Sequence, residues 1–348
     1  MLELWYGIVV LMLTAYVVLD GFDFGAGALH LSVARNDSER RQVLAAIGPF
    51  WDGNEVWLLA AGGALFVGFP RVLSAGISGF YFAIFLVLWC LIGRGLSIEF
   101  RSHVGDPLWR AAWDAMLALT STLLALFFGV AFGNLVRGVP LGADGWFSLA
   151  LFTSFLPADP VGILDLYTVA AGVFAVVALA AHGAAFLAWK TDGPVALRAR
   201  TAHLMLLAAT ALLWPAITIA TAWINPGLYT ALARRPLAWA LTALALGGLA
   251  TGFAARAKNK DRAAFMGSCA FLIGMLGATA AALFPVLLRA RGGDALSLTA
   301  AEAANDPHGL AVALTWFGVG LPLALFYLGV IGYLHRGRAR AAADGEGY

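Results

Sequence analysis

Residues 5–33 read WYGIVVLMLTAYVVLDGFDFGAGALHLSV, an apolar run long enough to cross a membrane as one helix. A hydrocarbon core of roughly 30 Å needs about 20 residues of α-helix. The run has no basic region before it and no obvious small-residue cleavage site, so we expect a retained helix and not a signal peptide. Asp20 and Asp23 lie well inside it, where an ionisable side chain is costly and needs a partner or a function.

The composition of the whole chain is that of a membrane protein. Of its 348 residues, 61% are hydrophobic and 12% are charged, and the mean hydropathy is +0.83. A soluble domain carries about 25% charged residues. We therefore predict an all-α polytopic membrane protein, a single membrane domain over residues 1–348. Its nine transmembrane helices are expected at residues 5–33, 43–69, 74–98, 110–134, 161–189, 202–224, 236–255, 263–288 and 309–335.

Loop lengths suggest how these helices are grouped. The longest connections follow the fourth and the eighth helices, and short connections favour antiparallel neighbours. We expect one four-helix bundle at residues 5–134, a second at 161–288, and a peripheral ninth helix at 309–335. Glycine pairs such as Gly21 and Gly25 predict places where helices approach closely.

The basic residues predict the orientation. The chain has 22 Lys and Arg residues, and most of them fall at alternate ends of the predicted helices, on the side that includes the C-terminus. By the positive-inside rule the N-terminus is outside and the C-terminus is cytoplasmic. The six basic residues on the other side are Arg71, Arg137, Arg234, Arg235, Arg289 and Arg291.

A second acidic pair lies in the second predicted helix. Asp52 and Glu55 occur in GPFWDGNEVWLLAAGG, residues 48–63, and the two antiparallel helices bring them to about the depth of Asp20 and Asp23. Each pair is spaced i, i+3 and so lies near one helical face. A file of buried carboxyls with bridging waters suits proton transfer, so we expect Asp52, Glu55 and Asp20 to line a proton pathway.

Further charges lie near the cytoplasmic ends of the third and fourth helices. Arg94 is placed to pair with Asp23 or Asp114, which would form an ion-pair network. Glu99 and Arg101 could stand at the mouth of the pathway. The alternative is that these charges only pair with one another and lock the helices together.

Other chemistry is poorly supported. The net charge of +2 is spread over loops, which argues against nucleic-acid binding. Cys90 and Cys269 form no CxxC motif, so we expect no metal site and no disulfide. Of the six histidines, His182 is the one deep within a predicted helix, so no two-histidine haem site is expected and we assign no cofactor to this chain alone.

Several motifs occur in order along the chain: DGFDFGAG at residues 20–27, RNDSERR at 35–41, GPFWDGNEVWLLAAGGALF at 48–66, SIEFRSH at 97–103, AAWDAM at 111–116 and FGVAFGNLVRGVP at 128–140. With them the sequence resembles subunit II of the cytochrome bd-type quinol oxidases over essentially its whole length. The resemblance implies a subunit of a terminal oxidase in the bacterial cytoplasmic membrane, which oxidises quinol and reduces dioxygen to water.

The resemblance also implies which parts belong elsewhere. Haem b, haem d and the quinol-oxidising loop would belong to a partner, subunit I, so this chain would hold no catalytic residue. Some members of the family have a small single-helix subunit, and some hold a structural quinone. The family pattern would make Asp52 a relay in the proton channel, and Asp23, Arg94 and Asp114 would maintain the haem-side environment. Glu55 stands where relatives often carry Gln, which adds a second titratable group.

Two other functions remain open. A proton-coupled secondary transporter or channel would also use carboxyls inside the membrane, but it predicts inverted repeats, and none is clear in the sequence. A purely structural oxidase subunit would use its acidic residues only in ion pairs. Turnover of Asp52 variants separates the structural role from the proton-conducting role.

Overall fold

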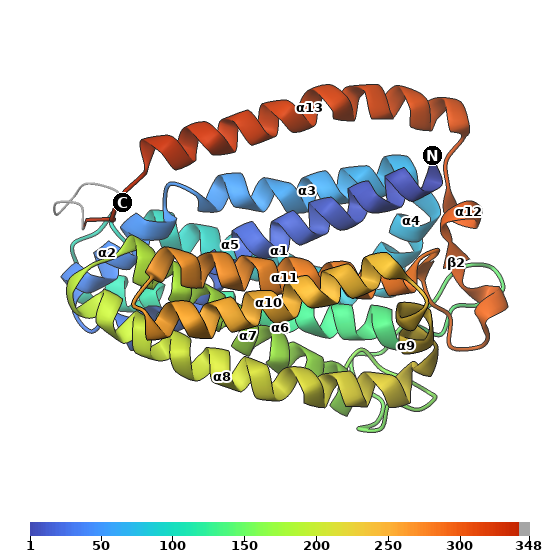
Figure 1. The fold of residues 1–348 in the computed structure, drawn as a ribbon, viewed down its shortest axis with the longest axis horizontal. Coiled ribbons are helices and arrows are strands. Elements are labelled where there is room, and N and C mark those ends of the chain that lie inside the picture. The colour runs from blue at the N-terminus through green and yellow to red at the C-terminus, as the bar shows by residue number, and fades with distance from the viewer. Residues whose placement is uncertain (341–348) are drawn as a thin grey trace.

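The structure is a computed structural model that describes residues 1–340, apart from the side chain of Asp294. Figure 1 shows long helices that run along the longest axis of the molecule, with the N-terminus at one end. The helices are α1 (Leu2–Val33), α2 (Asp37–Ile47), α3 (Trp51–Gly68), α4 (Pro70–Gly79), α5 (Tyr81–Phe100), α6 (Pro107–Arg137), α7 (Leu166–Lys190), α8 (Gly193–Ile224), α9 (Pro226–Ala233), α10 (Pro236–Ala257), α11 (Asp261–Leu283), α12 (Ala300–Ala303) and α13 (Pro307–Leu334).

Eight of the described helices are long and apolar enough to cross a membrane: α1, α5, α6, α7, α8, α10, α11 and α13. The predicted segment 43–69 is divided, because the chain leaves the helix at residues 48–50 and resumes as α3. Pro49 explains the break, because proline has no backbone N–H to donate to the hydrogen bonds of a helix interior. The 18 residues of α3 include Asp52, Asn54 and Glu55, which lower its hydropathy. A ninth span therefore stays a prediction.

Two other predicted segments are corrected by the structure. Segment 74–98 is divided at Phe80 into α4 and α5, after a stretch rich in Ser and Gly, which are weak helix formers. The end of segment 263–288 is not helical, because α11 ends at Leu283. There the strand β1 (Val286–Leu288) pairs antiparallel with β2 (Leu298–Thr299), and a 3₁₀ turn at Asp294–Leu296 lies between them.

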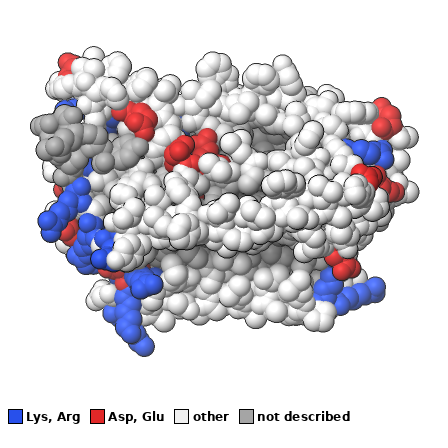
Figure 2. Space-filling model, turned by 90° about the horizontal axis from the view of Figure 1, so that it is seen from above, with Lys and Arg blue, Asp and Glu red and all other residues white. Residues whose placement is uncertain are grey.

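The charged side chains separate from the apolar surface. Figure 2 shows the Lys and Arg side chains of one face gathered at the two ends of the molecule, with a broad belt of mostly uncharged side chains between them. Such a belt between two charged ends matches the hydrocarbon core of a membrane and its two interfaces.

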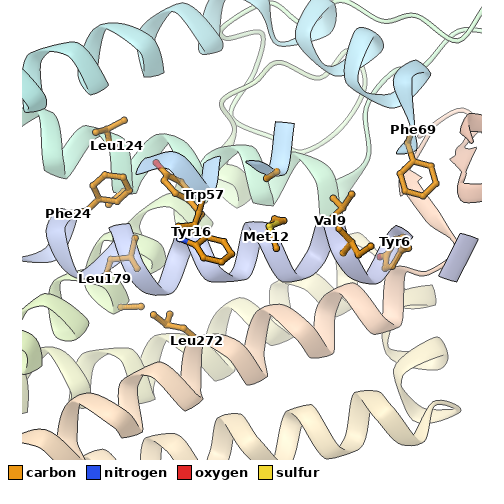
Figure 3. Close-up of a cluster of buried hydrophobic side chains, with 14 of the residues drawn as sticks. Tyr6, Val9, Met12, Tyr16, Phe24, Trp57, Phe69, Leu124, Leu179 and Leu272 are labelled. Atoms are coloured by element: carbon orange, nitrogen blue, oxygen red, sulfur yellow. The ribbon is translucent and has the colours of Figure 1, made fainter. Parts of the chain in front are cut away.

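Helix α1 is the centre of the packing. It contacts α3, α6, α7 and α11. Figure 3 shows side chains of α1, among them Val9, Met12, Tyr16 and Phe24, in one apolar cluster with residues of these neighbours. A helix enclosed on several sides by protein is the place where ionisable groups can be shielded from lipid.

The closest approach along α1 is to α7. A Cβ atom on Gly25 would lie 2.0 Å from the Leu179 carbonyl oxygen, and one on Gly183 would lie 2.3 Å from the Ala26 nitrogen. The predicted close packing at Gly25 is confirmed, because only glycine fits there. Since α6 also packs on α7, the regions 5–134 and 161–288 share an extensive interface, and their division into two bundles stays a prediction.

Helix α13 lies along the outside of the bundle (Figure 1), and Leu310 is its one buried residue. Its start is held by the Trp5 indole, which donates to the Leu310 carbonyl oxygen at 3.3 Å. Its end is held by Lys190, which donates to the His335 carbonyl oxygen at 2.6 Å. The middle of α13 reaches α3, where Tyr327 lies against Gly53.

Candidate functional site

The first charged cluster joins α1, α3 and α5 through Arg94. Its guanidinium forms an ion pair with Asp20, and its Nη2 donates to Glu55 Oε2 at 3.0 Å. Arg94 and Asp20 are completely buried, whereas the Glu55 side chain is 26% exposed. The guanidinium also lies over the Phe24 ring, 4.7 Å from its centroid. One cation thus holds two carboxylates, and the three groups form a path from the partly exposed Glu55 to the buried Asp20.

Asp23 occupies a different environment from the one expected. It is buried, and its Oδ2 accepts a hydrogen bond of 2.8 Å from the Asn54 amide of α3. The same amide donates to the Leu19 carbonyl oxygen at 3.1 Å. The expected pairing of Arg94 with Asp23 or Asp114 is therefore wrong, because Asp20 and Glu55 occupy the guanidinium.

Asp114 lies in a second cluster, at the end of the bundle where α1 and α5 end and α6 begins. Its Oδ1 lies 2.6 Å from His30 Nε2 and accepts from Arg101 Nε at 2.6 Å. Its Oδ2 accepts from Arg101 Nη2 at 3.1 Å and from Arg40 Nη1 at 3.0 Å. One buried carboxylate thus ties α1, α2 and α5 to α6.

The Asp114 cluster continues to the surface through Asp37, the first residue of α2. Arg101 Nη2 donates to Asp37 Oδ1 at 2.9 Å, and Arg110 Nη1 donates to Oδ2 at 3.2 Å. Partial burial alone would raise the pKa of Asp37, but the hydrogen bond from Arg101 and the charges of Arg110 and Arg41 outweigh it and hold the pKa below its ordinary value. Asp37 therefore stays ionised and shares the cationic charge of Arg101.

Asp52 and Glu99 lie on exposed faces. Asp52 continues a stripe of exposed residues on α3, spaced by three or four positions, which consists of Val56, Leu59, Gly63 and Phe66. Glu99 ends a similar stripe on α5, which consists of Phe85, Trp89, Ile92 and Leu96. Trp51 of α3 lies against Gly95 of α5, so the two helices come into contact near this end. Asp52 is one helical turn from Glu55, and it is more exposed than Glu55.

Several members of these clusters were missed by sequence reasoning. His30 was expected only to lie near a helix end, and Arg101 to stand with Glu99 at the mouth of the pathway, whereas each contacts Asp114. A third cluster, at the opposite end of the bundle, was not expected at all: Arg137 pairs with Asp165 and also donates to Asn134 Oδ1 at 2.6 Å. The spacing of Asn134 and Arg137 on one face of α6 was the available signal.

Two of the buried histidines already have hydrogen-bond partners. His182 Nε2 donates to the Val18 carbonyl oxygen at 2.9 Å, and its Nδ1 lies 2.7 Å from Ser268 Oγ. His30 is committed to Asp114. Within residues 1–340, no group of three or more His, Cys, Asp or Glu side chains could hold a metal ion.

The fold and the site define a multi-pass helical membrane protein that keeps arginine–carboxylate clusters among its helices. The family model described as cytochrome bd terminal oxidase subunit II matches residues 1–334. The chain belongs to this family, and the family expected from its motifs is confirmed.

Curated relatives agree with this assignment. Over 198 residues the chain is 41% identical to cytochrome bd-I ubiquinol oxidase subunit 2 of Escherichia coli (strain K12) and 35% identical to cytochrome bd ubiquinol oxidase subunit 2 of Bacillus subtilis (strain 168). The match covers 57% of this chain, and 51% and 56% of those proteins. The chain thus spans about half the length of the curated relatives it matches.

A solved structure shares the fold. A chain in the structure of bd oxidase from Geobacillus thermodenitrificans superposes with a TM-score of 0.72 at 17% sequence identity. The superposition covers 96% of this chain and 98% of that chain. The architecture is therefore common to both proteins along almost their whole length.

Proposed function

We propose that this chain is the second subunit of a cytochrome bd-type terminal oxidase, a quinol:oxygen oxidoreductase of the bacterial cytoplasmic membrane. The observation that carries the proposal is the family match over residues 1–334. Haem b and haem d, which supply the redox chemistry of the complex, are assigned to subunit I. This chain supports that subunit and supplies protons from the cytoplasm, with its N-terminus outside and its C-terminus inside. A small third subunit and a structural quinone are compatible with this role.

The exposure of Asp52 supports a partner subunit. A charged carboxyl that faces lipid inside a membrane costs about 3 kcal/mol. Asp52 is exposed in the isolated chain, on the same stripe of α3 as Leu59 and Phe66. Contact with another protein over this face would remove the carboxyl from lipid and would also cover the apolar residues of the stripe. Subunit I is the partner that the family provides.

The arrangement of the carboxyls supports a proton pathway. Asp52 is the outer group, Glu55 follows one turn further along α3, and Arg94 connects Glu55 to Asp20. Glu99, at the end of α5, would stand at the cytoplasmic mouth. A carboxyl can take a proton from one neighbour and release it to the next, while the Arg94 charge compensates the carboxylate that is left behind. In this proposal Asp23 and Asp114 maintain the charge balance near subunit I, each in its own cluster.

An optical spectrum tests the oxidase assignment. The complex is purified through a tag on this chain, and its reduced-minus-oxidised difference spectrum is recorded. We expect the bands of haem b and haem d, together with a second large subunit. A colourless chain that purifies alone would contradict the assignment and would favour the proton-coupled transporter or channel.

The Asp52→Asn variant tests the proton pathway. We expect it to assemble with the same haem bands but to consume oxygen more slowly, on the order of tenfold to 100-fold, because an amide cannot release and rebind a proton. Asp52→Glu should retain more activity. The matched control is Asp144→Asn, in the exposed loop at the opposite end. A normal rate for Asp52→Asn would remove Asp52 from the pathway and leave the purely structural subunit as the better explanation.

A further inference from the structure

We infer that the turn between α10 and α11, with the groove beside it, binds the headgroup of an anionic phospholipid through Lys260 and Arg262. This inference does not depend on the oxidase assignment. It depends on the membrane-spanning fold, and the proposed orientation places the site at the cytoplasmic leaflet.

The groove is shallow and open, and its lining changes from charged to apolar along its length. It has a volume of about 520 Å³. Its polar end is formed by the turn and the start of α11, and its apolar end by Ala263 and Met266 of α11 beside Thr251 of α10. Leu244 and Ile273 are exposed two turns deeper on the same faces. A headgroup at the turn would therefore have an apolar surface below it for its acyl chains.

The charge of the groove is positive although an aspartate lines it. Asp261 accepts from Arg200 Nη2 at 2.7 Å and from Arg256 Nη2 at 2.7 Å, so two buried or partly buried arginines already compensate its carboxylate. Lys260 and Arg262 are exposed, and among residues 1–340 neither has an ion-pair partner. Both cations are therefore available to a phosphate group.

The two cations are held on a rigid support. A Cβ atom on Gly248 would lie 2.4 Å from the Phe271 nitrogen, so α10 and α11 are in close contact. The turn between them is tight: Asn259 adopts φ +52°, and the Lys260 N–H donates to the Ala255 carbonyl oxygen at 2.9 Å. Because the backbone is fixed before a ligand arrives, little backbone entropy is lost on binding.

The occupant that fits is an anionic phospholipid and not a zwitterionic one. Basic pockets at the cytoplasmic side of membrane helices attract anionic headgroups, and each Lys or Arg near the surface contributes about 1 kcal/mol. A zwitterionic headgroup carries its own cation and gains less from this field. The apolar end of the groove favours a lipid over free phosphate, because free phosphate has no apolar part that could contact it.

The test compares lipid binding to the complete purified complex. Wild type and the Lys260→Gln/Arg262→Gln variant are placed in nanodiscs of equal parts phosphatidylcholine and phosphatidylglycerol, and the lipids that stay bound are counted by native mass spectrometry. We expect phosphatidylglycerol to bind about 30-fold more weakly to the variant, which corresponds to two lost cations. Phosphatidylcholine binding should not change.

The matched control is Arg338→Gln/Arg340→Gln, which removes two exposed arginines that do not line the groove. It should retain phosphatidylglycerol as wild type does. An equal loss of bound phosphatidylglycerol in both double variants would show a general charge effect and would contradict the proposed site. Unchanged retention by Lys260→Gln/Arg262→Gln would overturn it too, and would indicate that another protein covers the groove. Both outcomes can be read whether or not the complex is an oxidase.

Discussion

Replacing Arg94 with leucine should lower the free energy of unfolding by about 3–5 kcal/mol, the usual loss when one partner of a buried ion pair is removed. Arg94 is completely buried, and it is the cation that contacts both Asp20 and Glu55. Without it, Asp20 must stay charged among apolar residues or take up a proton. Unfolding of the purified complex in mixed micelles, followed by circular dichroism, measures the loss.

A double variant that also removes Asp20 should partly restore the stability lost in Arg94→Leu. In Arg94→Leu/Asp20→Leu the pair is replaced by apolar side chains, and part of the lost stability should return, because such replacements are often neutral or stabilising. Glu55 is partly exposed and can be solvated in this variant. The matched control is Arg234→Leu, an exposed arginine at the opposite end, which should change stability by less than about 0.5 kcal/mol. The same stability for Arg94→Leu and Arg234→Leu would refute the prediction.

Replacing Asp114 with leucine should have an effect of similar size, again about 3–5 kcal/mol. Arg101 is 1% exposed, and it would lose the carboxylate that accepts two of its hydrogen bonds. Arg40 and His30 would each lose their contact with the same carboxylate. The same unfolding experiment measures the change. The protein should also become more sensitive to protease between α1 and α2, since Asp114 holds that connection to α6.

The control for Asp114 lies on the same helix. Asp106 caps the start of α6, where its Oδ1 accepts from the Trp109 N–H at 2.9 Å, and it is exposed. Asp106→Ala should therefore lose only the cap, about 1 kcal/mol. If Asp114→Leu lost no more than Asp106→Ala, the cluster would contribute no more than a surface cap.

The sequence was sufficient for the class of fold but not for the pairing of charges. Hydropathy and length located the helices, since a membrane requires a long apolar run for each crossing. Depth along the membrane suggested Asp23 or Asp114 as partners for Arg94, and the structure pairs Arg94 with Asp20 and Glu55. Residues spaced i, i+3 differ by about 60° around a helix. The depth of a residue in the membrane does not determine this angle. Because of the angle, Asp20 faces Arg94 and Asp23 faces Asn54.

The break in the second predicted helix and the exposure of Asp52 were missed for a different reason. Pro49 was visible in the sequence and predicts a break, but the apolar pattern on both sides favoured one long helix. The exposure of Asp52 was not visible, because it depends on which face of α3 packs against α1. Arg101 was expected at the open mouth of the pathway, and its burial depends on contacts with α2 and α6 that form only in the folded chain.

The Asp114 cluster also has a consequence for biosynthesis. His30 and Arg40 are made well before their counter-ion, 84 and 74 residues ahead of Asp114. Until α6 has been made, Arg40 and Arg101 lack the Asp114 carboxylate, and under the proposed orientation their positive charge would favour retention of this end in the cytoplasm during insertion. Once α6 is in place, Asp114 and Asp37 together compensate the two charges. Under that orientation the same arginines would contribute first to the topology of the nascent chain and then to the packing of its helices.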